Sequence, residues 1–196
     1  MKKSLILFLF TCLLAGCAQI PEPQEIPWLT HKQQLENLND WSFSGKLAFI
    51  TPEERHSLNI HWKQSENNFH ITLTTFLGVT VLDLEKTQSG THIVDNDGKR
   101  FFGEDAEVLI KQLSGLVIPV DALQQWIKGN PSDATYQLNP ENQVASLTSV
   151  DPEDAPWSID YSDYKNTQGI SLPYKLQLKR SDLRLKFAIS KWKIRT

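Results

Sequence analysis

The sequence predicts a mainly β protein with helices, built as one antiparallel sheet that curls toward a barrel. Apolar residues alternate with polar ones over about ten or eleven short segments, with turn signals between them. Two helical patterns lie together in the middle of the chain. A closed barrel with that many strands is wider than its own side chains can fill. We therefore expect an apolar interior cavity that the helices partly plug.

The first residues have the features of a bacterial export signal. Lys2 and Lys3 precede Leu5–Leu14, an apolar run far shorter than the about 20 residues that span a bilayer as a helix. Leu14-Ala15-Gly16-Cys17 is typical of the lipobox, in which the cysteine is acylated and the chain is cut before it. Residues 1–16 are therefore predicted to be a removed signal peptide, with Cys17 as the lipidation site. A plain secretory signal with an incidental cysteine is the alternative.

The residues after Cys17 predict a tether and a location. Pro21, Pro23 and Pro27 stiffen a polar stretch, so residues 17–27 are expected to form a lipid-anchored tether. Ala18 stands where an Asp tends to hold lipoproteins of enteric bacteria in the inner membrane, which favours the outer membrane, facing the periplasm. Loss of two lysines would change the net charge from −3 to −5. Residues 28–196 are then a single domain without the basic excess of nucleic-acid-binding proteins.

A helix and a first series of strands are expected next. Residues 28–39 fit a helix that Thr30 could cap. From Trp41 on, the apolar period becomes two. Asn96-Asp97-Gly98 predicts a tight turn before one more strand residue, Phe101. The expected strands are 41–49, 58–62, 69–75, 79–84 and 91–94.

Two helices interrupt the strands. Glu104 and Asp105 favour a helix N-terminus, and the apolar stripe that follows ends at Gly115. Pro119 opens a second, short helix that closes at Gly129. Strands are then expected at 136–138, 144–150, 157–161, 174–178, 183–189 and 192–194.

No motif in the sequence indicates catalysis, a metal or a cofactor. The histidines lack the spacing of metal ligands, and after the predicted cleavage the remaining cysteine carries lipid. Gly-x-Ser-x-Gly and Gly-x-Gly-x-x-Gly are both absent from the sequence. We therefore expect a protein that is not an enzyme and needs no cofactor or metal, with a hydrolase as an alternative. The histidines are His31, His56, His61, His70 and His92.

Phe76 and Leu77 occupy an unusual place, the tip between two expected strands, where polar residues are normal. Gly78 supplies the turn. One interpretation is that both side chains fold back into the core. The other is an exposed apolar tip that enters a bilayer or touches an acyl chain. Burial of one such side chain in lipid contributes about 1.5–3 kcal/mol, enough for transient contact and too little for anchoring.

Several short segments stand in a specific order and spacing along residues 28–196, although none is diagnostic by itself. They are Leu38–Trp41, Ser44–Phe49, Trp62–Gln64, Leu77–Gly78, Asp97–Phe101, Asp105–Glu107, Leu113–Gly115, Ile118–Gly129, Leu172–Tyr174 and Lys191–Ile194. Together they resemble the LolB family of outer-membrane lipoprotein receptors. The resemblance implies an incomplete antiparallel barrel closed by helices, with an apolar cavity for lipoprotein acyl chains.

The resemblance also implies partners and a delivery loop. Such receptors accept lipoproteins from the soluble periplasmic carrier LolA and release them into the outer membrane without ATP or metal. Leu77 takes the place of an exposed family leucine implicated in delivery, so Phe76, Leu77 and Gly78 form the expected membrane-insertion loop. Phe76 replaces the family's proline, and Pro156 stands where the family tends to have glycine. We expect a monomer whose partners are LolA, acylated lipoproteins and outer-membrane lipid, with no nucleic acid.

Aromatic and aliphatic side chains of the strands and helices are candidates for the wall of the acyl-binding cavity. A core role for each stays open, because cavity wall and core share one apolar pattern. An outer-membrane lipoprotein with a structural or assembly role, whose sheet binds another protein, is the alternative function. The cavity candidates are Trp41, Phe43, Phe49, Trp62, Phe69, Leu109, Leu113 and Trp126.

Overall fold

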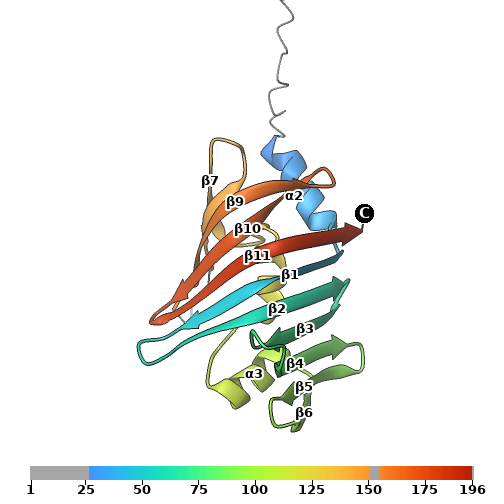
Figure 1. Ribbon diagram of the computed structural model, residues 1–196. Helices are drawn as coiled ribbons and strands as arrows, with labels where there is room; N and C mark the ends of the chain where they lie inside the picture. Colours follow the sequence, from blue (N-terminus) through green and yellow to red (C-terminus); the bar gives the residue numbers. More distant parts are fainter. Residues whose placement is uncertain (1–26, 151–154, 196) are drawn as a thin grey trace, which may run out of the picture.

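One antiparallel sheet of eleven strands dominates the computed structural model, which describes residues 27–150 and 155–195 (Figure 1). The expected signal peptide, Cys17 and almost all of the tether lie outside these residues. Among the described residues, no helix is long and apolar enough to cross a bilayer. The elements are α2 (Trp28–Asn37), β1 (Asp40–Ile50), β2 (Arg55–Ser65), β3 (Asn68–Thr74), β4 (Thr80–Thr87), β5 (Gly90–Asp95), β6 (Arg100–Gly103), α3 (Ala106–Ser114), α4 (Val120–Trp126), β7 (Thr135–Leu138), β8 (Val144–Thr148), β9 (Ser158–Thr167), β10 (Ile170–Arg180) and β11 (Leu183–Arg195).

The sheet consists of two meanders joined at its centre. Its strand order is β6-β5-β4-β3-β2-β1-β11-β10-β9-β8-β7, so the first and last long strands, β1 and β11, pair with each other. The described edge strands β6 and β7 are not paired with one another, and the sheet stays unclosed. The chain between them carries α3 and α4, which lie on one face of the curved sheet (Figure 1). The predicted unclosed antiparallel sheet with helices is confirmed.

Alternation along the strands separates an inner face, which carries the helices, from an outer face. In β11, Leu185, Phe187 and Ile189 are buried, whereas the intervening Lys186 and Ala188 are exposed. Side chains of a strand point to opposite faces in turn. The apolar set of every long strand therefore covers the inner face, and the core sits between the sheet and its helices.

A β-bulge in the β1–β11 ladder accounts for one wrong prediction. The register shifts between Ser44 and Gly45, where two consecutive residues of β11, Ser190 and Lys191, interrupt the alternation. The sequence pattern therefore indicated two closing strands, whereas β11 runs unbroken from Leu183 to Arg195. A Cβ atom at Gly45 would overlap the carbonyl oxygen of Ala188, so this close approach of the strands requires glycine.

The helix ends agree with the sequence in one case and differ in another. The Asp105 carboxylate accepts hydrogen bonds from the backbone N–H groups of Glu107 (2.7 Å) and Val108 (3.2 Å), and Gly115 ends α3 with φ +71°. Thr30 does not cap α2, because the helix already begins at Trp28 and Thr30 lies inside its first turn. The fixed φ of the preceding proline, Pro27, prepares this start without a side-chain cap.

Candidate functional site

The inner face is hollow under the helical segment, and this pocket is the candidate site. Five neighbouring strands form its wall, and α3, α4 and the chain between them form its cover. All lining residues except Ser114 are apolar. The lining consists of Leu47, Phe49, Ile60, Trp62, Ile71, Leu73, Leu82, Leu84, Leu185 and Phe187 from the sheet, and of Ile110, Ser114, Leu116, Ile118, Val120 and Leu123 from the cover.

The size of the pocket limits what it can hold as it stands. Its volume of about 130 Å³ is close to that of an engineered apolar cavity of about 150 Å³ that stays dry and binds benzene. Pockets that hold drug-sized molecules measure about 300–1,000 Å³. The site is therefore a contracted apolar pocket, suited to part of one hydrocarbon chain unless its cover moves outward.

Two of the eight predicted cavity residues, Phe49 and Trp62, line this pocket. From α3, Ile110 and Ser114 take part in the lining, whereas Leu109 packs against Gly103 of β6 and Leu113 is partly buried beside the core. Trp126 is buried at the end of α4, where its carbonyl oxygen accepts a hydrogen bond from the Tyr161 hydroxyl (2.8 Å).

The other predicted residues belong to an aromatic cluster on the same inner face, outside the pocket lining. Trp41 lies 5.5 Å from Trp192 between ring centroids, and Phe43 lies 5.1 Å from the same ring. Phe69 lies 6.1 Å from Trp62, which belongs to both the cluster and the pocket. Aromatic side chains thus fill the part of the inner face next to the pocket.

Sequence reasoning missed the aliphatic lining because it favoured aromatic residues. Leu47, Ile60, Ile71 and Leu73 have the same phase as the chosen aromatic residues of their strands. What the sequence did not reveal is which part of each strand faces the hollow under the helices. For Leu47 and Leu73, the signal that could have found them is their position near the β1–β2 and β3–β4 turns.

Polar contacts attach the cover to the sheet. Lys86 of β4 donates to both carboxylate oxygens of Asp121 in α4, at 2.9 and 3.1 Å. The Gln64 side-chain amide donates to Gln124 Oε1 (2.9 Å). On the other side, Arg180 of β10 donates to the carbonyl oxygen of Val117 (3.3 Å). These contacts lie around the cover and leave its inner surface apolar.

A half-buried carboxyl group joins the two helices of the cover. Glu107 of α3 accepts a hydrogen bond from the backbone N–H of Asp121 at 3.4 Å. Burial raises the pKa of Glu107, and the nearby carboxylates of Asp121 and Asp105 raise it further, although the hydrogen bond opposes the shift. The charged groups of the cover therefore interact with one another and with β4 rather than with the pocket.

The tip between β3 and β4 is exposed, which decides against the interpretation that it folds into the core. Phe76 is 85% and Leu77 is 76% exposed. The loop that carries them is well defined: Gly78 N–H donates to the Thr75 carbonyl (3.0 Å), and Thr75 N–H donates to the Val79 carbonyl (2.8 Å). Gly78 adopts φ +84°, as the turn requires.

The tip and the pocket share the same two strands. Leu73, the last inward residue of β3, and Leu82, the first of β4, both line the pocket. Between them, eight residues of chain lead out to Phe76 and Leu77 and back. In Figure 1 the β3–β4 turn lies on the same side of the sheet as the β1–β2 and β10–β11 turns. An apolar group could thus pass from the pocket to the tip over a short distance.

The histidines form separate polar pairs. His61 hydrogen-bonds Ser44, His70 lies 2.9 Å from Asp83, and His92 lies 3.1 Å from Glu85. Among residues 27–150 and 155–195, no three His, Cys, Asp or Glu side chains come together as metal ligands would. The apolar pocket and tip therefore remain the strongest candidate site of the described chain.

Comparison with known proteins assigns the family. The family described as "Outer membrane lipoprotein LolB" matches residues 39–192. The chain belongs to the LolB family. A protein of Psychromonas ingrahamii named "Outer-membrane lipoprotein LolB" is 54% identical over 98% of this chain and 96% of its own length. A protein of the same name from Vibrio cholerae is 37% identical over 92% of this chain and 90% of its own.

Solved structures show that the LolB family fold is shared more widely. A LolA superfamily protein from Nitrosomonas europaea has a TM-score of 0.55 at 8% identity, covering 87% of this chain and 94% of that one. A DUF1329 family protein from Desulfovibrio piger has a TM-score of 0.56 at 8% identity, and the match covers 85% of this chain and 90% of that one. At this identity the likeness concerns the fold alone.

Proposed function

We propose that this member of the LolB family is an outer-membrane lipoprotein that accepts lipoproteins from the periplasmic carrier LolA and inserts them into the outer membrane. The acyl chains of the incoming lipoprotein enter the apolar pocket, and the tip formed by Phe76, Leu77 and Gly78 then contacts the bilayer. The process needs no enzyme chemistry and no cofactor, because binding and release of hydrocarbon are sufficient. A structural or assembly role does not account for an internal apolar pocket beside an exposed apolar tip.

The anchor in this proposal is Cys17, outside the described residues. Residues 1–16 are removed as a signal peptide, and residues 17–27 tether a monomeric domain to the periplasmic side of the outer membrane. One acyl chain gives only marginal membrane binding, whereas the three of a bacterial lipoprotein make the attachment permanent. The receptor therefore stays beside the membrane that receives its cargo.

One observation carries the proposal: an apolar pocket and an exposed apolar tip share strands β3 and β4. Leu73 and Leu82 line the pocket, and the turn between them exposes Phe76 and Leu77. Burial of each methylene contributes about 0.8 kcal/mol to the binding of an acyl chain. A pocket that covers only part of the chain therefore binds it less strongly than the bilayer does. The tip can contact hydrocarbon that moves from the pocket to the bilayer.

The cover has to move for a lipoprotein to be held. A pocket of about 130 Å³ is too small for several acyl chains, since even drug-sized ligands occupy about 300–1,000 Å³. The polar contacts around the cover, such as Lys86–Asp121, are few and partly exposed. Outward movement of α3 and α4 would enlarge the pocket while the sheet keeps its register.

The test separates uptake from delivery in the full acylated chain. Leu73→Trp fills the pocket and should reduce binding of a fluorescent fatty acid at least about tenfold. Leu77→Glu should leave that binding and the capture of a lipoprotein from LolA unchanged, while incorporation into phospholipid vesicles falls about tenfold or more, because about 1.5–3 kcal/mol of membrane contact is lost.

Matched variants control for size and charge. Val81→Trp places the same ring next to Leu82 but on the opposite phase of β4, and it should not affect fatty-acid binding. Leu29→Glu puts the same charge on α2 at a leucine that is 78% exposed, and it should not affect delivery. If Leu77→Glu reduces capture and delivery equally, the tip has no separate delivery role. If the unsubstituted chain binds no fatty acid, the receptor function itself is wrong.

A further inference from the structure

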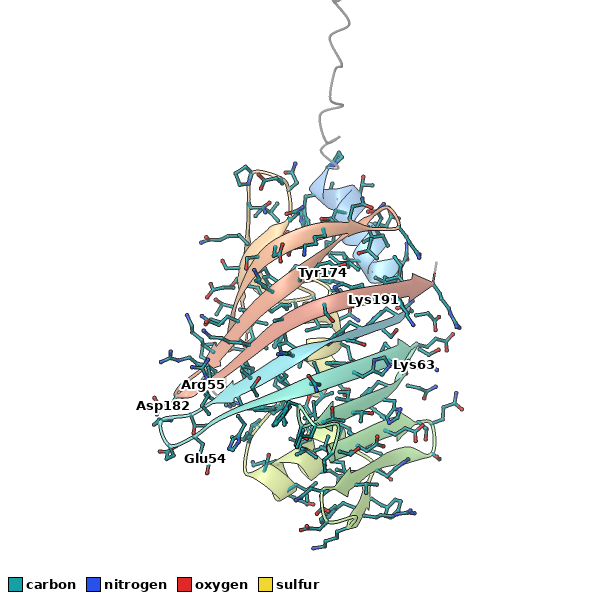
Figure 2. All side chains as sticks on the ribbon, in the orientation of Figure 1. Glu54, Arg55, Lys63, Tyr174, Asp182 and Lys191 are labelled. Atoms are coloured by element: carbon teal, nitrogen blue, oxygen red, sulfur yellow. The ribbon has the colours of Figure 1, made fainter. Side chains whose placement is uncertain are left out.

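A buried amide interrupts the apolar inner face of β2. Gln64 is 4% exposed and lies two residues from Trp62, which lines the pocket and is 1% exposed. Lys63, labelled in Figure 2, stands between them and is exposed on the outer face, so Trp62 and Gln64 share the inner face of the strand. A buried polar side chain is stable only when its hydrogen-bonding groups have partners. The partners of Gln64 therefore show what it does.

The hydrogen bonds of the Gln64 amide join one wall of the pocket to one helix of its cover. The oxygen Oε1 accepts a hydrogen bond from the indole N–H of Trp62 at 3.3 Å. The nitrogen Nε2 donates to the carbonyl oxygen of Glu66 at 2.6 Å and to Oε1 of Gln124 in α4 at 2.9 Å. Since an indole N–H can only donate and a carbonyl oxygen can only accept, these partners fix the orientation of the amide.

The hydrogen bonds continue through α4 and return to the sheet. Gln124 Nε2 donates to Oδ1 of Asp121 at 3.0 Å, and Lys86 of β4 donates to the same carboxylate. We call Trp62, Gln64, Gln124, Asp121 and Lys86 the amide network. From the indole to the carboxylate each member donates to the next one, and the carboxylate can only accept. The neighbours of a member that moves away therefore cannot reverse their hydrogen bonds to replace it.

Helix α4 takes part in the pocket and in the amide network at once. Val120 and Leu123 line the pocket, and each is followed directly by a member of the network, Asp121 or Gln124. On the sheet, Trp62 combines both roles in one side chain, because its ring lines the pocket and its N–H begins the network. Movement of the ring or of the helix thus changes the space for hydrocarbon and the hydrogen bonds together.

The Trp62 ring closes the pocket toward the aromatic cluster. Its centroid lies 5.5 Å from that of Trp41 and 6.1 Å from that of Phe69, and neither of these residues lines the pocket. Since a pocket of about 130 Å³ accommodates only part of one hydrocarbon chain, a longer acyl chain has to displace side chains of the lining. Displacement of the Trp62 ring withdraws its N–H from Gln64, and hydrocarbon supplies no donor in its place.

We propose that Gln64 is a positioning residue through which hydrocarbon in the pocket loosens the cover. An entering acyl chain moves the Trp62 ring, and the buried oxygen of Gln64 loses its donor. The amide then turns toward another partner and leaves Gln124, so the contact between the sheet and α4 weakens. This inference rests on the proposed function, in which the pocket takes up the acyl chains of a lipoprotein. Because such coupling is reciprocal, a protein in which the amide network is already broken should bind hydrocarbon more tightly.

The experiment compares palmitate affinity among variants of the full acylated chain, at one fixed concentration of a neutral detergent so that partition into micelles is equal. Gln64→Met removes the centre of the network, and Gln124→Met removes its member on α4, each with a side chain of similar length. The matched control is Gln125→Met, which removes an amide of α4 whose partner, Asn130, lies outside the network. The readouts are the palmitate dissociation constant and the NMR resonance of the Trp62 indole N–H, assigned by its loss in Trp62→Phe.

We expect Gln64→Met and Gln124→Met each to bind palmitate about three- to tenfold more tightly than the unsubstituted chain. The double variant should bind no more tightly than Gln64→Met, and Gln125→Met should bind as the unsubstituted chain does. A purely structural role of Gln64 predicts no gain in affinity, because loss of stability alone does not tighten binding. Palmitate should also move the Trp62 indole proton resonance of the unsubstituted chain upfield, since a proton that loses its hydrogen bond becomes more shielded.

The variant on α4 keeps the inference falsifiable if Gln64→Met does not fold. Unchanged or weaker palmitate affinity in Gln124→Met, or an equal gain in Gln125→Met, would overturn the inference and leave the receptor function intact. The same holds if palmitate binds without moving the Trp62 indole resonance, because the ring then keeps its hydrogen bond to Gln64. Absence of palmitate binding by the unsubstituted chain would overturn both proposals.

Discussion

The two ends of the inner face are packed in different ways. At one end, which we call the filled end, Trp41, Phe43 and Trp192 contact one another at centroid distances of 5.1–6.0 Å and leave no space. At the other, the hollow end, aliphatic residues such as Leu47 and Ile71 face a pocket of about 130 Å³. Both ends come from strands with the same apolar alternation.

What differs is the size of the side chains and the element that covers them. Large rings reach across the curved sheet at the filled end, where α2 adds the fully buried Leu35. Leucine and isoleucine reach less far at the hollow end, and the cover there includes the non-helical segment 115–119 between two short helices. A sheet can therefore hold a solid core and a binding pocket side by side without any change in its pattern.

Truncation of Phe43 should have the largest effect of the changes that test this comparison. Phe43 is 1% exposed and lies at the centre of the filled end. Phe43→Ala removes a ring that no neighbour can replace, so the unfolding free energy should fall by about 3–5 kcal/mol. Fatty-acid binding by the folded fraction should not change, because Phe43 does not line the pocket. Denaturant titration and a binding titration measure the two effects.

Leu82→Ala is the matched truncation at the hollow end. Leu82 is partly exposed and already borders empty space, so the loss of stability should be about 1 kcal/mol. The pocket should enlarge, and fatty-acid affinity should change instead. If both truncations destabilise the chain by the same amount, the filled and hollow ends do not differ in packing.

Most of the fold could be predicted from the sequence because it depends on local signals. Period-two alternation located the strands, and Asp105 and Gly115 marked the ends of α3. The β-bulge could not be foreseen, because an interruption at Ser190 and Lys191 looks like the end of a strand unless the partner strand is known. The start of α2 at Trp28 was predicted correctly, but the cap was misjudged, because Pro27 precedes the helix and Thr30 supplies no side-chain cap.

The candidate site was less predictable, because it depends on contacts between distant segments. The tip was recognisable as unusual, since Phe76 and Leu77 break the rule that hairpin tips are polar, but only the structure shows that both side chains are exposed. The pocket was not, because core and cavity wall share one pattern and only the placement of α3 and α4 separates them. The attachment of the cover through Lys86 and Asp121 joins residues 35 positions apart, which carry no local signal.

A pH experiment sharpens the comparison at the filled end, where a buried lysine ties α4 to α2. Lys128 is 1% exposed and donates to the carbonyl oxygens of Leu35 (2.7 Å) and Leu38 (2.9 Å) at the end of α2. Burial lowers the pKa of Lys128 from its ordinary 10.5 to about 8, although Glu36 raises it slightly. Between pH 8 and 10 the unfolded chain therefore binds more protons than the folded chain, and stability should rise with pH.

The measurement is the free energy of unfolding against pH for the unsubstituted chain and for Lys128→Met. The difference between the two should change in favour of the unsubstituted chain by up to about 3 kcal/mol from pH 7 to 10. Burial also raises the pKa values of Tyr161 and Tyr164, and this lowers stability above pH 10 in both chains alike, so it cancels in the difference. Parallel curves would show that the Lys128 amine titrates in the folded state as it does in the unfolded chain.

The smallest effect on stability should come from a change at the hollow end that affects the opening of the cover rather than the packing of the core. Lys86→Ala removes the ion pair with Asp121, which is partly exposed, so unfolding should change by less than about 1 kcal/mol. Because the same pair holds the cover against β4, its loss should raise the rate of fatty-acid entry by about two- to fivefold. Lys32→Ala removes the Lys32–Glu36 pair on α2 and should leave the entry rate unchanged. Equal entry rates in all three chains would mean that the cover opens without breaking the Lys86–Asp121 contact, and that the pocket is gated by its apolar packing alone.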